Sequence, residues 1–175
     1  MDVIIGDIGK FLKENGAHPS KQGQVFETGP QRTSGRKPVL YLAGPINGCS
    51  DSDANDWRSE VKERLSDCYD FLDPMARDYR GRENESYKEI VRGDLADIEK
   101  CHVIIANCPK PSVGTSMEIY HAFNNRCKRV IVVAPVPMSP WLKYFSTAQY
   151  TTIGAAVTYA RTISKSVLLD MAVKA

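Results

Sequence analysis

Four short apolar runs recur along the chain, and each is followed by a stretch in which apolar residues return every three or four positions. The runs cover residues 38–43, 69–72, 102–106 and 128–134. Short apolar runs bounded by Gly, Pro, Asn or Asp are typical of strands buried on both faces. Because such runs alternate with helical stretches, the pattern predicts an α/β fold. We expect a doubly wound, Rossmann- or flavodoxin-like parallel sheet of about five strands with helices on both faces.

The helical stretches are marked by their apolar stripes and by the residues that precede them. Ser52 and Asp53 are expected to cap the first helix, and Ser86 with Glu89 forms a possible capping box for the second. The stripes, in chain order, are Trp57, Val61 and Leu65; Tyr87, Ile90, Val91, Leu95 and Ile98; Ile119, Ala122 and Phe123; and Ile153, Ala156, Val157, Ala160 and Ile163, which Val167, Leu168 and Met171 prolong. Residues at this spacing share one helix face, so each stripe is expected to pack on the sheet.

The first 37 residues carry a different pattern. Residues 1–14 place five large apolar side chains at helical spacing, which favours a short amphipathic helix. Residues 17–37 are rich in Gly, Ser, Pro, Gln and basic residues without periodicity, as in a linker. We therefore expect an N-terminal helix and linker over residues 1–37, followed by one α/β domain over residues 38–175.

Three polar loops follow the carboxyl ends of predicted strands. They cover residues 44–48, 77–85 and 112–114. Because the carboxyl ends of parallel strands meet at one edge of a sheet, we expect these loops to converge on a single crevice. The loop over residues 77–85 is long enough to act as a lid. The glycines of the loop over residues 44–48 lack the spacing of a Walker or dinucleotide fingerprint, and such a loop is more often only a tight turn.

Residues 112–118 carry the strongest candidate chemistry. Ser112, Gly114 and Thr115 offer hydroxyls and unhindered backbone N–H groups. Glu118 is expected in the first turn of the following helix, where the helix dipole keeps a carboxylate ionised and ready to act as a nucleophile or base. The structural alternative is a capping box between Thr115 and Glu118, which is the commoner explanation of this motif taken alone.

Asp94 is the second candidate, because it interrupts the apolar stripe of the second helix. It lies between Tyr87 and Ile98 at helical spacing, and a charge at such a position is costly unless it is used or paired. The helix could rotate to bring Asp94 to solvent or to an arginine such as Arg92. We favour a functional role, because an isolated carboxylate on a buried stripe is the kind of anomaly that sites produce.

Composition changes the picture mainly by exclusion. A chain of 175 residues, 42% hydrophobic and 25% charged, suits a globular domain with a substantial core. Its net charge of +2 argues against a nucleic-acid partner, because nucleic-acid-binding proteins concentrate much more basic charge. No stretch is apolar enough to cross or anchor in a membrane, and no secretory signal is recognisable, so we expect a cytoplasmic protein.

Cysteine and histidine do not suggest a bound metal. The five cysteines are odd in number and lack paired short spacings, and the three histidines are not spaced like ligands. We expect reduced thiols, and neither a metal nor a cofactor.

Three motifs together give a resemblance to a known family. They are the sequence Tyr-Leu-Ala-Gly-Pro at residues 41–45, Asp94 followed by Leu95, and residues 112–118. In this order and separation they resemble the nucleoside 2-deoxyribosyltransferase superfamily, which also contains the 2'-deoxynucleoside 5'-monophosphate N-glycosidases. The resemblance covers about residues 38–165.

The resemblance implies roles for three residues. The glutamate matching Glu118 attacks the anomeric carbon and forms a covalent deoxyribosyl enzyme with retention, the aspartate matching Asp94 assists protonation of the leaving base, and the tyrosine matching Tyr41 orients the nucleophile. Without the family, Tyr41 is equally well an aromatic of a core strand. Cleavage through an oxocarbenium-like state needs a nucleophilic carboxylate and an acid. An ionised Glu118 and an Asp94 whose pKa is raised by burial would meet this need.

The resemblance also implies a set of substrate contacts, in a small-molecule site without nucleic acid or membrane. Ser112 matches a serine that binds the 5'-phosphate in the monophosphate glycosidases, but Asn47 stands where an arginine is common, and Asp73 resembles the base-binding edge of the transferases. The expected set is Gly44, Pro45, Ile46, Asn47, Gly48, Asp73, Ser112, Gly114, Met138 and Ser139. We expect deoxyribosyl transfer, with a nucleotide N-glycosidase and a non-catalytic nucleotide-binding module as alternatives.

Members of this family share each site between subunits, through residues that follow the fourth strand. Met138, Ser139 and Trp141 lie in the matching region. The resemblance therefore implies a homodimer or a higher homo-oligomer. The alternative is that Trp141 is buried within its own subunit.

Overall fold

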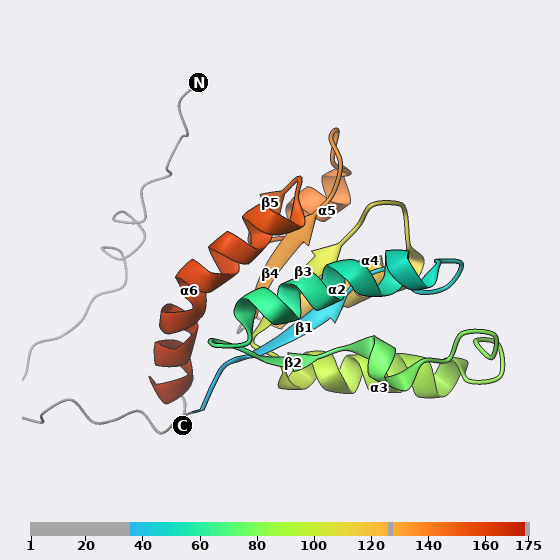
Figure 1. Cartoon of the computed structure of the whole chain (residues 1–175), viewed down its shortest axis with the longest axis horizontal. Coiled ribbons are helices and arrows are strands. Elements are labelled where there is room, and N and C mark those ends of the chain that lie inside the picture. The colour runs from blue at the N-terminus through green and yellow to red at the C-terminus, as the bar shows by residue number, and fades with distance from the viewer. Residues whose placement is uncertain (1–35, 126–127, 174–175) are drawn as a thin grey trace, which may run out of the picture. The chain divides into compact units, whose positions relative to one another are not determined.

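The computed structural model describes residues 36–125 and 128–173. The predicted helix over residues 1–14 and nearly all of the predicted linker lie outside the described residues. The elements are β1 (Val39–Ala43), α2 (Asp51–Leu65), β2 (Asp70–Leu72), the 3₁₀ helix η1 (Pro74–Arg77), α3 (Tyr87–Lys100), β3 (Val103–Asn107), α4 (Val113–Asn124), β4 (Arg129–Val133), α5 (Pro140–Tyr144), β5 (Ala148–Tyr150) and α6 (Ile153–Val173), as Figure 1 shows.

The five strands form one parallel sheet in the order β2-β1-β3-β4-β5. This confirms the predicted doubly wound α/β fold. The chain order reverses at β1, which pairs with β2 on one side and β3 on the other. In sheets of this order, ligands bind outside the carboxyl ends of the strands at such a switch point.

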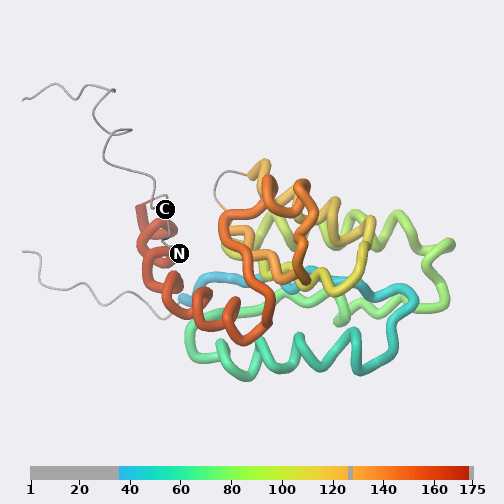
Figure 2. The backbone as a smooth tube through the Cα atoms, turned by 90° about the horizontal axis from the view of Figure 1, so that it is seen from above, coloured from blue at the N-terminus to red at the C-terminus, as the bar shows by residue number. Residues whose placement is uncertain are grey.

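Alternate strand residues feed two separate cores. Leu40 and Leu42 of β1 pack with the stripes of α2 and α6 on one face. Tyr41 and Ala43 face the opposite side, with residues of α3 and α4. Figure 2 shows α2 and α6 on one side of the strands, with α3 on the other. Each fully buried aliphatic side chain contributes about 1.5–3 kcal/mol, so the two faces together fix the positions of the strand ends.

The sequence predicts a sheet of about five strands but gives the position of only four of them. β5 covers three residues, Ala148–Tyr150, pairs only with β4, and is partly exposed. Such a short edge strand has no continuous apolar run, because neither of its faces is fully covered. The other strands lie within one residue of the predicted bounds at each end.

The expected apolar stripe of α3 and the expected cap of α2 need correction. Tyr87 is 57% exposed and Val91 54%. Val91 lines an open cavity instead of a closed core, and Tyr87 lies at the exposed start of α3. The N-cap of α2 is Ser50, whose Oγ accepts a hydrogen bond from the Asp53 N–H at 3.1 Å. Ser86 does precede α3, but its side chain makes no capping hydrogen bond.

None of the helices in the described part of the chain is both long and apolar enough to cross a membrane.

Candidate active site

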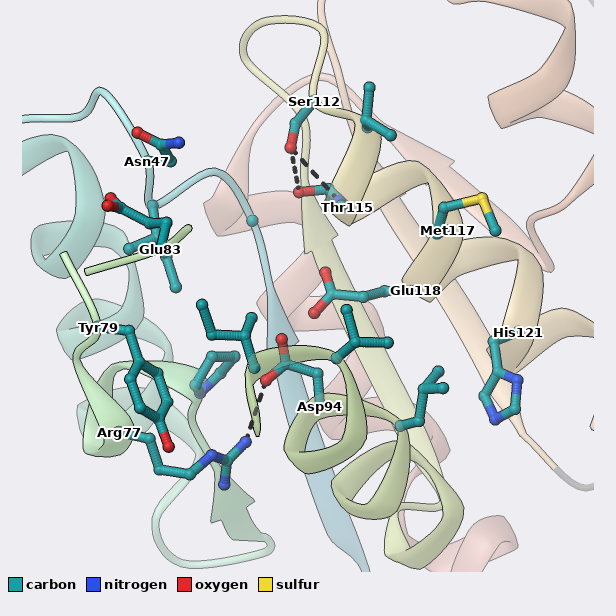
Figure 3. A pocket seen from close by; sticks show the side chains of 18 of the residues that line it. Asn47, Arg77, Tyr79, Glu83, Asp94, Ser112, Thr115, Met117, Glu118 and His121 are labelled. Atoms are coloured by element: carbon teal, nitrogen blue, oxygen red, sulfur yellow. Dashed lines mark hydrogen bonds and ion pairs between the residues drawn. The ribbon is translucent and has the colours of Figure 1, made fainter. Parts of the chain in front are cut away.

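A cavity of about 620 Å³ lies at the carboxyl ends of β1 and β3, where the chain order reverses. The three loops predicted to converge do meet here, and α3 and α4 complete the walls (Figure 3). Seven of the residues proposed from the sequence line it: Gly44, Ile46, Asn47, Asp94, Ser112, Gly114 and Glu118. Tyr41 lies beneath them, fully buried in β1.

Glu118 projects into the cavity from the second turn of α4. The helix begins at Val113 with Ser112 as its N-cap, so the predicted first-turn position of Glu118 is wrong. The capping-box alternative is also wrong, because Ser112 rather than Thr115 caps the helix. The Tyr41 hydroxyl donates a hydrogen bond to Glu118 Oε1 at 2.6 Å, which leaves the second carboxylate oxygen of Glu118 without this bond.

Burial raises the pKa of Glu118 to about 8. This value already includes a smaller upward effect of the Asp94 charge, and the Tyr41 hydrogen bond and the Arg58 guanidinium oppose both upward effects. The expectation that the helix dipole keeps Glu118 ionised is therefore incorrect for the free protein, because the carboxyl lies deep in the cavity and past the first turn, where the dipole effect fades. Burial also holds the pKa of Tyr41 above its ordinary range, so its hydroxyl remains a donor.

Asp94 lies on α3 and faces Glu118 across the cavity, as Figure 3 shows. Its Oδ1 accepts a hydrogen bond from Arg77 Nη2 at 3.0 Å, so its arginine partner is Arg77 and not Arg92. Burial raises the pKa of Asp94, as the sequence predicted, although Arg77 and Tyr41 oppose this effect. Two carboxyl groups with raised pKa values thus share one cavity.

Ser112 has a free proton to offer a ligand. Its Oγ accepts hydrogen bonds from the Thr115 N–H at 3.3 Å and from the Thr115 hydroxyl at 3.0 Å. With both acceptor positions used, the Ser112 O–H remains available as a donor, and Ser112 lines the cavity. The first N–H groups of α4, including that of Gly114, lie beside it and favour an oxygen-rich ligand group.

Only some residues of the loop after β1, residues 44–48, line the cavity. Gly44 has no room for a side chain, because a Cβ atom there would lie 2.7 Å from the Trp57 ring. Pro45 is buried, and Gly48 turns the chain with a φ of +67°. These two residues, expected to contact substrate, do not line the cavity in this chain. Their positions instead shape the loop that presents Ile46 and Asn47.

Asp73 lies outside the cavity, contrary to expectation. Its carboxylate accepts a hydrogen bond from the Met75 N–H at 2.9 Å and so caps η1. It also pairs with Arg58 Nε at 3.4 Å and with Lys62. With its oxygens engaged by three groups, Asp73 fixes the turn after β2 instead of facing a ligand.

Met138 and Ser139 line a second cavity of about 650 Å³, next to the first. The two cavities share Met117 and Tyr120 of α4 and Ser112, the N-cap of this helix. Trp141 borders the second cavity and is 73% exposed. The alternative in which Trp141 is buried within its own subunit is therefore wrong.

Several cavity residues could not be identified from the sequence. Arg77, Tyr79 and Glu83 come from the segment predicted to be a lid, and His121 lies one turn after Glu118 on α4. Nothing in the local sequence pairs Arg77 with α3. The available signal was Gly93, a glycine inside a helix, which usually marks close packing. Within residues 36–125 and 128–173, no group of three or more His, Cys, Asp or Glu is placed to hold a metal ion.

The fold and the cavity together define a doubly wound α/β protein with a tyrosine and two carboxyl groups at its switch point. The family model described as nucleoside 2-deoxyribosyltransferase like matches residues 37–136. The chain belongs to this family. No curated protein sequence matches it.

Two solved structures share the architecture. A 2-deoxyribosyltransferase from Bacillus psychrosaccharolyticus superposes with a TM-score of 0.56 at 15% identity, over 69% of this chain and 91% of that enzyme. A molybdenum cofactor binding protein from Rippkaea orientalis gives a TM-score of 0.53 at 15% identity, over 74% of this chain and 99% of that protein. At such identity the likeness shows the fold alone, because one fold carries many functions.

Proposed function

We propose that the protein is an enzyme that cleaves the N-glycosidic bond of 2'-deoxynucleosides and transfers the deoxyribosyl group to another base. Family membership supports a deoxyribosyltransferase or N-glycosidase class of reaction. The observation that carries the proposal is the arrangement of two carboxyl groups across one cavity, with Tyr41 donating a hydrogen bond to Glu118. The cavity volume of about 620 Å³ lies within the range of small-molecule sites.

The reaction proceeds in two balanced steps. In the first, the Glu118 oxygen that Tyr41 leaves free forms a bond to C1' as the C1'–N bond breaks, and the bonding pair passes to the base nitrogen. Asp94 gives its proton to the departing base. In the second, a nitrogen of the acceptor base displaces Glu118 from C1' and returns its proton to Asp94. Both steps pass through oxocarbenium-like states, which a facing carboxylate stabilises.

This reaction requires one proton on the carboxyl pair. Burial raises the pKa of both Glu118 and Asp94, and the negative charge of Asp94 further disfavours ionisation of Glu118. Near neutral pH the pair holds a single proton, as coupled carboxyls do. The productive form has Glu118 ionised and Asp94 protonated. The Tyr41 hydrogen bond and the Arg58 charge favour it, because both lower the pKa of Glu118.

A second candidate is hydrolysis of 2'-deoxynucleoside 5'-monophosphates. It is favoured by the free Ser112 proton and the N–H groups at the start of α4, which would suit a phosphate. Among the described residues that line the cavity, however, Arg77 and Arg80 are both paired with carboxylates. A phosphate would therefore lack a free cation in the cavity wall, which is why we put transfer between nucleosides first.

We also propose that two copies of the chain associate through the second cavity. Trp141 and Tyr144 are 73% and 72% exposed beside it, and large exposed aromatic surfaces mark interaction sites. Met138 and Ser139 would then lie near the partner's substrate. The cytoplasmic location expected from the sequence stays a prediction.

One incubation series tests the proposal. Deoxynucleosides and their 5'-monophosphates are incubated with and without a second free base, and products are separated by chromatography. Transfer predicts a new nucleoside that forms only when the second base is present. Release of base from monophosphates without acceptor would instead identify the N-glycosidase, and binding without any product would identify the non-catalytic module.

A further inference from the structure

Arg77 holds two carboxylates of α3 with one guanidinium group. Its Nη2 donates to Asp94 Oδ1 at 3.0 Å, and its Nη1 pairs with Asp97 Oδ2. Asp94 and Asp97 are three residues apart on one helix face, so the two ends of the guanidinium reach one carboxylate each. Arg77 also lines the cavity (Figure 3). One oxygen of Asp94 is thereby fixed, and the other points toward Glu118.

Gly93 makes this contact possible. A Cβ atom at Gly93 would lie 2.9 Å from Arg77 Nε and 3.2 Å from its Cζ. The guanidinium therefore lies directly on the backbone of α3. A glycine inside a helix costs about 0.5–1 kcal/mol relative to alanine, and here it leaves room for the Arg77 guanidinium beside the helix backbone.

The backbone that presents Arg77 is itself anchored. Arg77 is the last residue of η1, and Asp73 caps the start of this turn. Asp73 in turn pairs with the fully buried Arg58, which also donates to the Gly44 carbonyl oxygen at 3.0 Å. Arg77 thus projects from a short turn that these contacts anchor.

We propose that Arg77 is a positioning residue for the leaving-group acid: it orients Asp94 toward the departing base and stabilises the carboxylate that remains when the proton has left. This rests on the proposed function. The bond that breaks is O–H on the free oxygen of Asp94, and the bond that forms is N–H on the base. The charge left on Asp94 is balanced by the guanidinium at 3.0 Å, in a partly buried site where such pairing is effective.

The groups facing Asp94 explain why an arginine is needed. Glu118 of α4 and Asp97 of α3 both oppose a negative charge on Asp94, whereas the Tyr41 hydroxyl of β1 supports it. Arg77 of η1 is the one cation that bonds Asp94 among the described residues. Burial opposes the loss of a proton from Asp94, and Arg77 makes that loss less costly during reaction.

The first test is Arg77→Met, assayed with two kinds of leaving group. With ordinary deoxynucleosides, whose bases leave with a proton, kcat is expected to fall about 10- to 100-fold while KM changes by less than about threefold. With 7-methyl-2'-deoxyguanosine, whose cationic base leaves without needing a proton, kcat is expected to change by less than about threefold. Equal losses with both substrates would overturn the proposal.

Two further variants separate positioning from a general structural effect. Arg77→Lys keeps the charge but cannot reach both carboxylates, so it should recover part of the lost kcat. The matched control is Arg161→Met, which removes an arginine that pairs with Asp67 on the opposite face of the sheet. It should leave kcat unchanged for both substrates. A loss in Arg161→Met equal to that in Arg77→Met would contradict a specific role.

A second measurement does not depend on activity. Aspartate side-chain carboxyls labelled with ¹³C are titrated by NMR in the wild type and in Arg77→Met, with Asp94→Asn used to assign the signal. Loss of the guanidinium should raise the pKa of Asp94, and an unchanged pKa would overturn the proposal. If the wild type cleaves no nucleoside at all, the proposed function fails, while this titration still decides whether Arg77 controls Asp94.

Discussion

Two arginine–aspartate pairs lie near the same edge of the sheet, yet only one of the two lines the cavity. In the Arg58–Asp73 pair the side chains are 1% and 9% exposed, and Asp73 is also engaged by Lys62 and by a backbone N–H. In the Arg77–Asp94 pair they are 32% and 20% exposed, and one oxygen of Asp94 faces the cavity (Figure 3). The difference teaches that a carboxylate with every oxygen engaged stabilises structure, whereas one with a free oxygen in a cavity can transfer a proton.

The largest effect is expected for Glu118→Ala. Removing the nucleophile should lower kcat/KM by about 10⁴-fold or more, as for other covalent catalysts. The measurement is initial rate of base release from a deoxynucleoside with an acceptor present. Far-UV circular dichroism should match the wild type. A variant that keeps the normal rate would exclude the covalent route.

Asp94→Asn is expected to have the next largest effect. An amide cannot donate the acidic proton, so kcat should fall about 10²- to 10⁴-fold, the usual contribution of a general acid. The loss should shrink with a leaving base that needs no proton. An identical loss for all leaving groups would mean that Asp94 acts in binding, and the contrast with Asp73 would disappear.

The substitution Arg58→Met removes the ion pair between Arg58 and Asp73. This change leaves Asp73 with less compensation in a buried setting, where removal of one partner costs about 3–5 kcal/mol. Thermal denaturation should show a large drop in Tm. Arg77→Met, in the more open pair, should lower the free energy of unfolding by only about 1 kcal/mol. Similar destabilisation by both substitutions would erase the distinction between the pairs.

Tyr41→Phe sharpens the assignment of Glu118 as the group that must ionise. The Tyr41 hydrogen bond lowers the pKa of Glu118, which is about 8 when the bond is present. In the wild type, kcat/KM should therefore fall as the pH rises through about 8, where the carboxyl pair loses its one proton. In Tyr41→Phe this falling limb should move to higher pH, with about a tenfold loss at pH 7 because less of the pair carries an ionised Glu118. An unmoved limb would assign the ionisation to another group.

The smallest effect is a gain in stability for Glu118→Gln. Burial raises the folded-state pKa of Glu118 from 4.5 to about 8, so the folded protein prefers the protonated form. The wild type is then most stable below pH 4.5 with respect to this group and loses stability as pH rises through 8. Because the side chain keeps some solvent contact at the cavity, we expect about 1–2 kcal/mol in favour of Gln above that range. Equal Tm values for the two proteins at pH 5 and pH 9 would refute this.

Much of the fold follows from local sequence, because its strands are apolar and its helices are amphipathic. Residues 102–106 and 128–134 identify central strands, since only a strand covered on both faces is apolar throughout. β5 could not be located in this way, because a three-residue edge strand is defined by its hydrogen bonds to β4. The exposure of Val91 likewise reflects a cavity that only tertiary packing creates.

The site was only partly predictable for the same reason. Asp94 was identifiable because it interrupts the apolar stripe of a helix, where an unpaired charge is costly. Glu118 was identifiable because it follows a polar loop at the end of a buried strand. Arg77 did not, because its partners lie 17 and 20 residues away on another element. The raised pKa of Glu118 was not predicted, because its main cause is burial in a cavity that only tertiary packing creates. The start of α4 at Val113, with Ser112 as the N-cap, also places Glu118 beyond the first turn. Caps depend on hydrogen bonds that the sequence alone leaves open.

The most direct test of the central claim is to trap the intermediate. The protein is mixed with a deoxynucleoside in the absence of acceptor base, quenched in acid, digested and analysed by mass spectrometry. We expect the peptide that contains Glu118 to carry one added deoxyribosyl group, and we expect the adduct to disappear when an acceptor base is added before the quench. An adduct on a different residue, or turnover with no adduct in rapidly quenched samples, would contradict the assignment of Glu118 as the nucleophile.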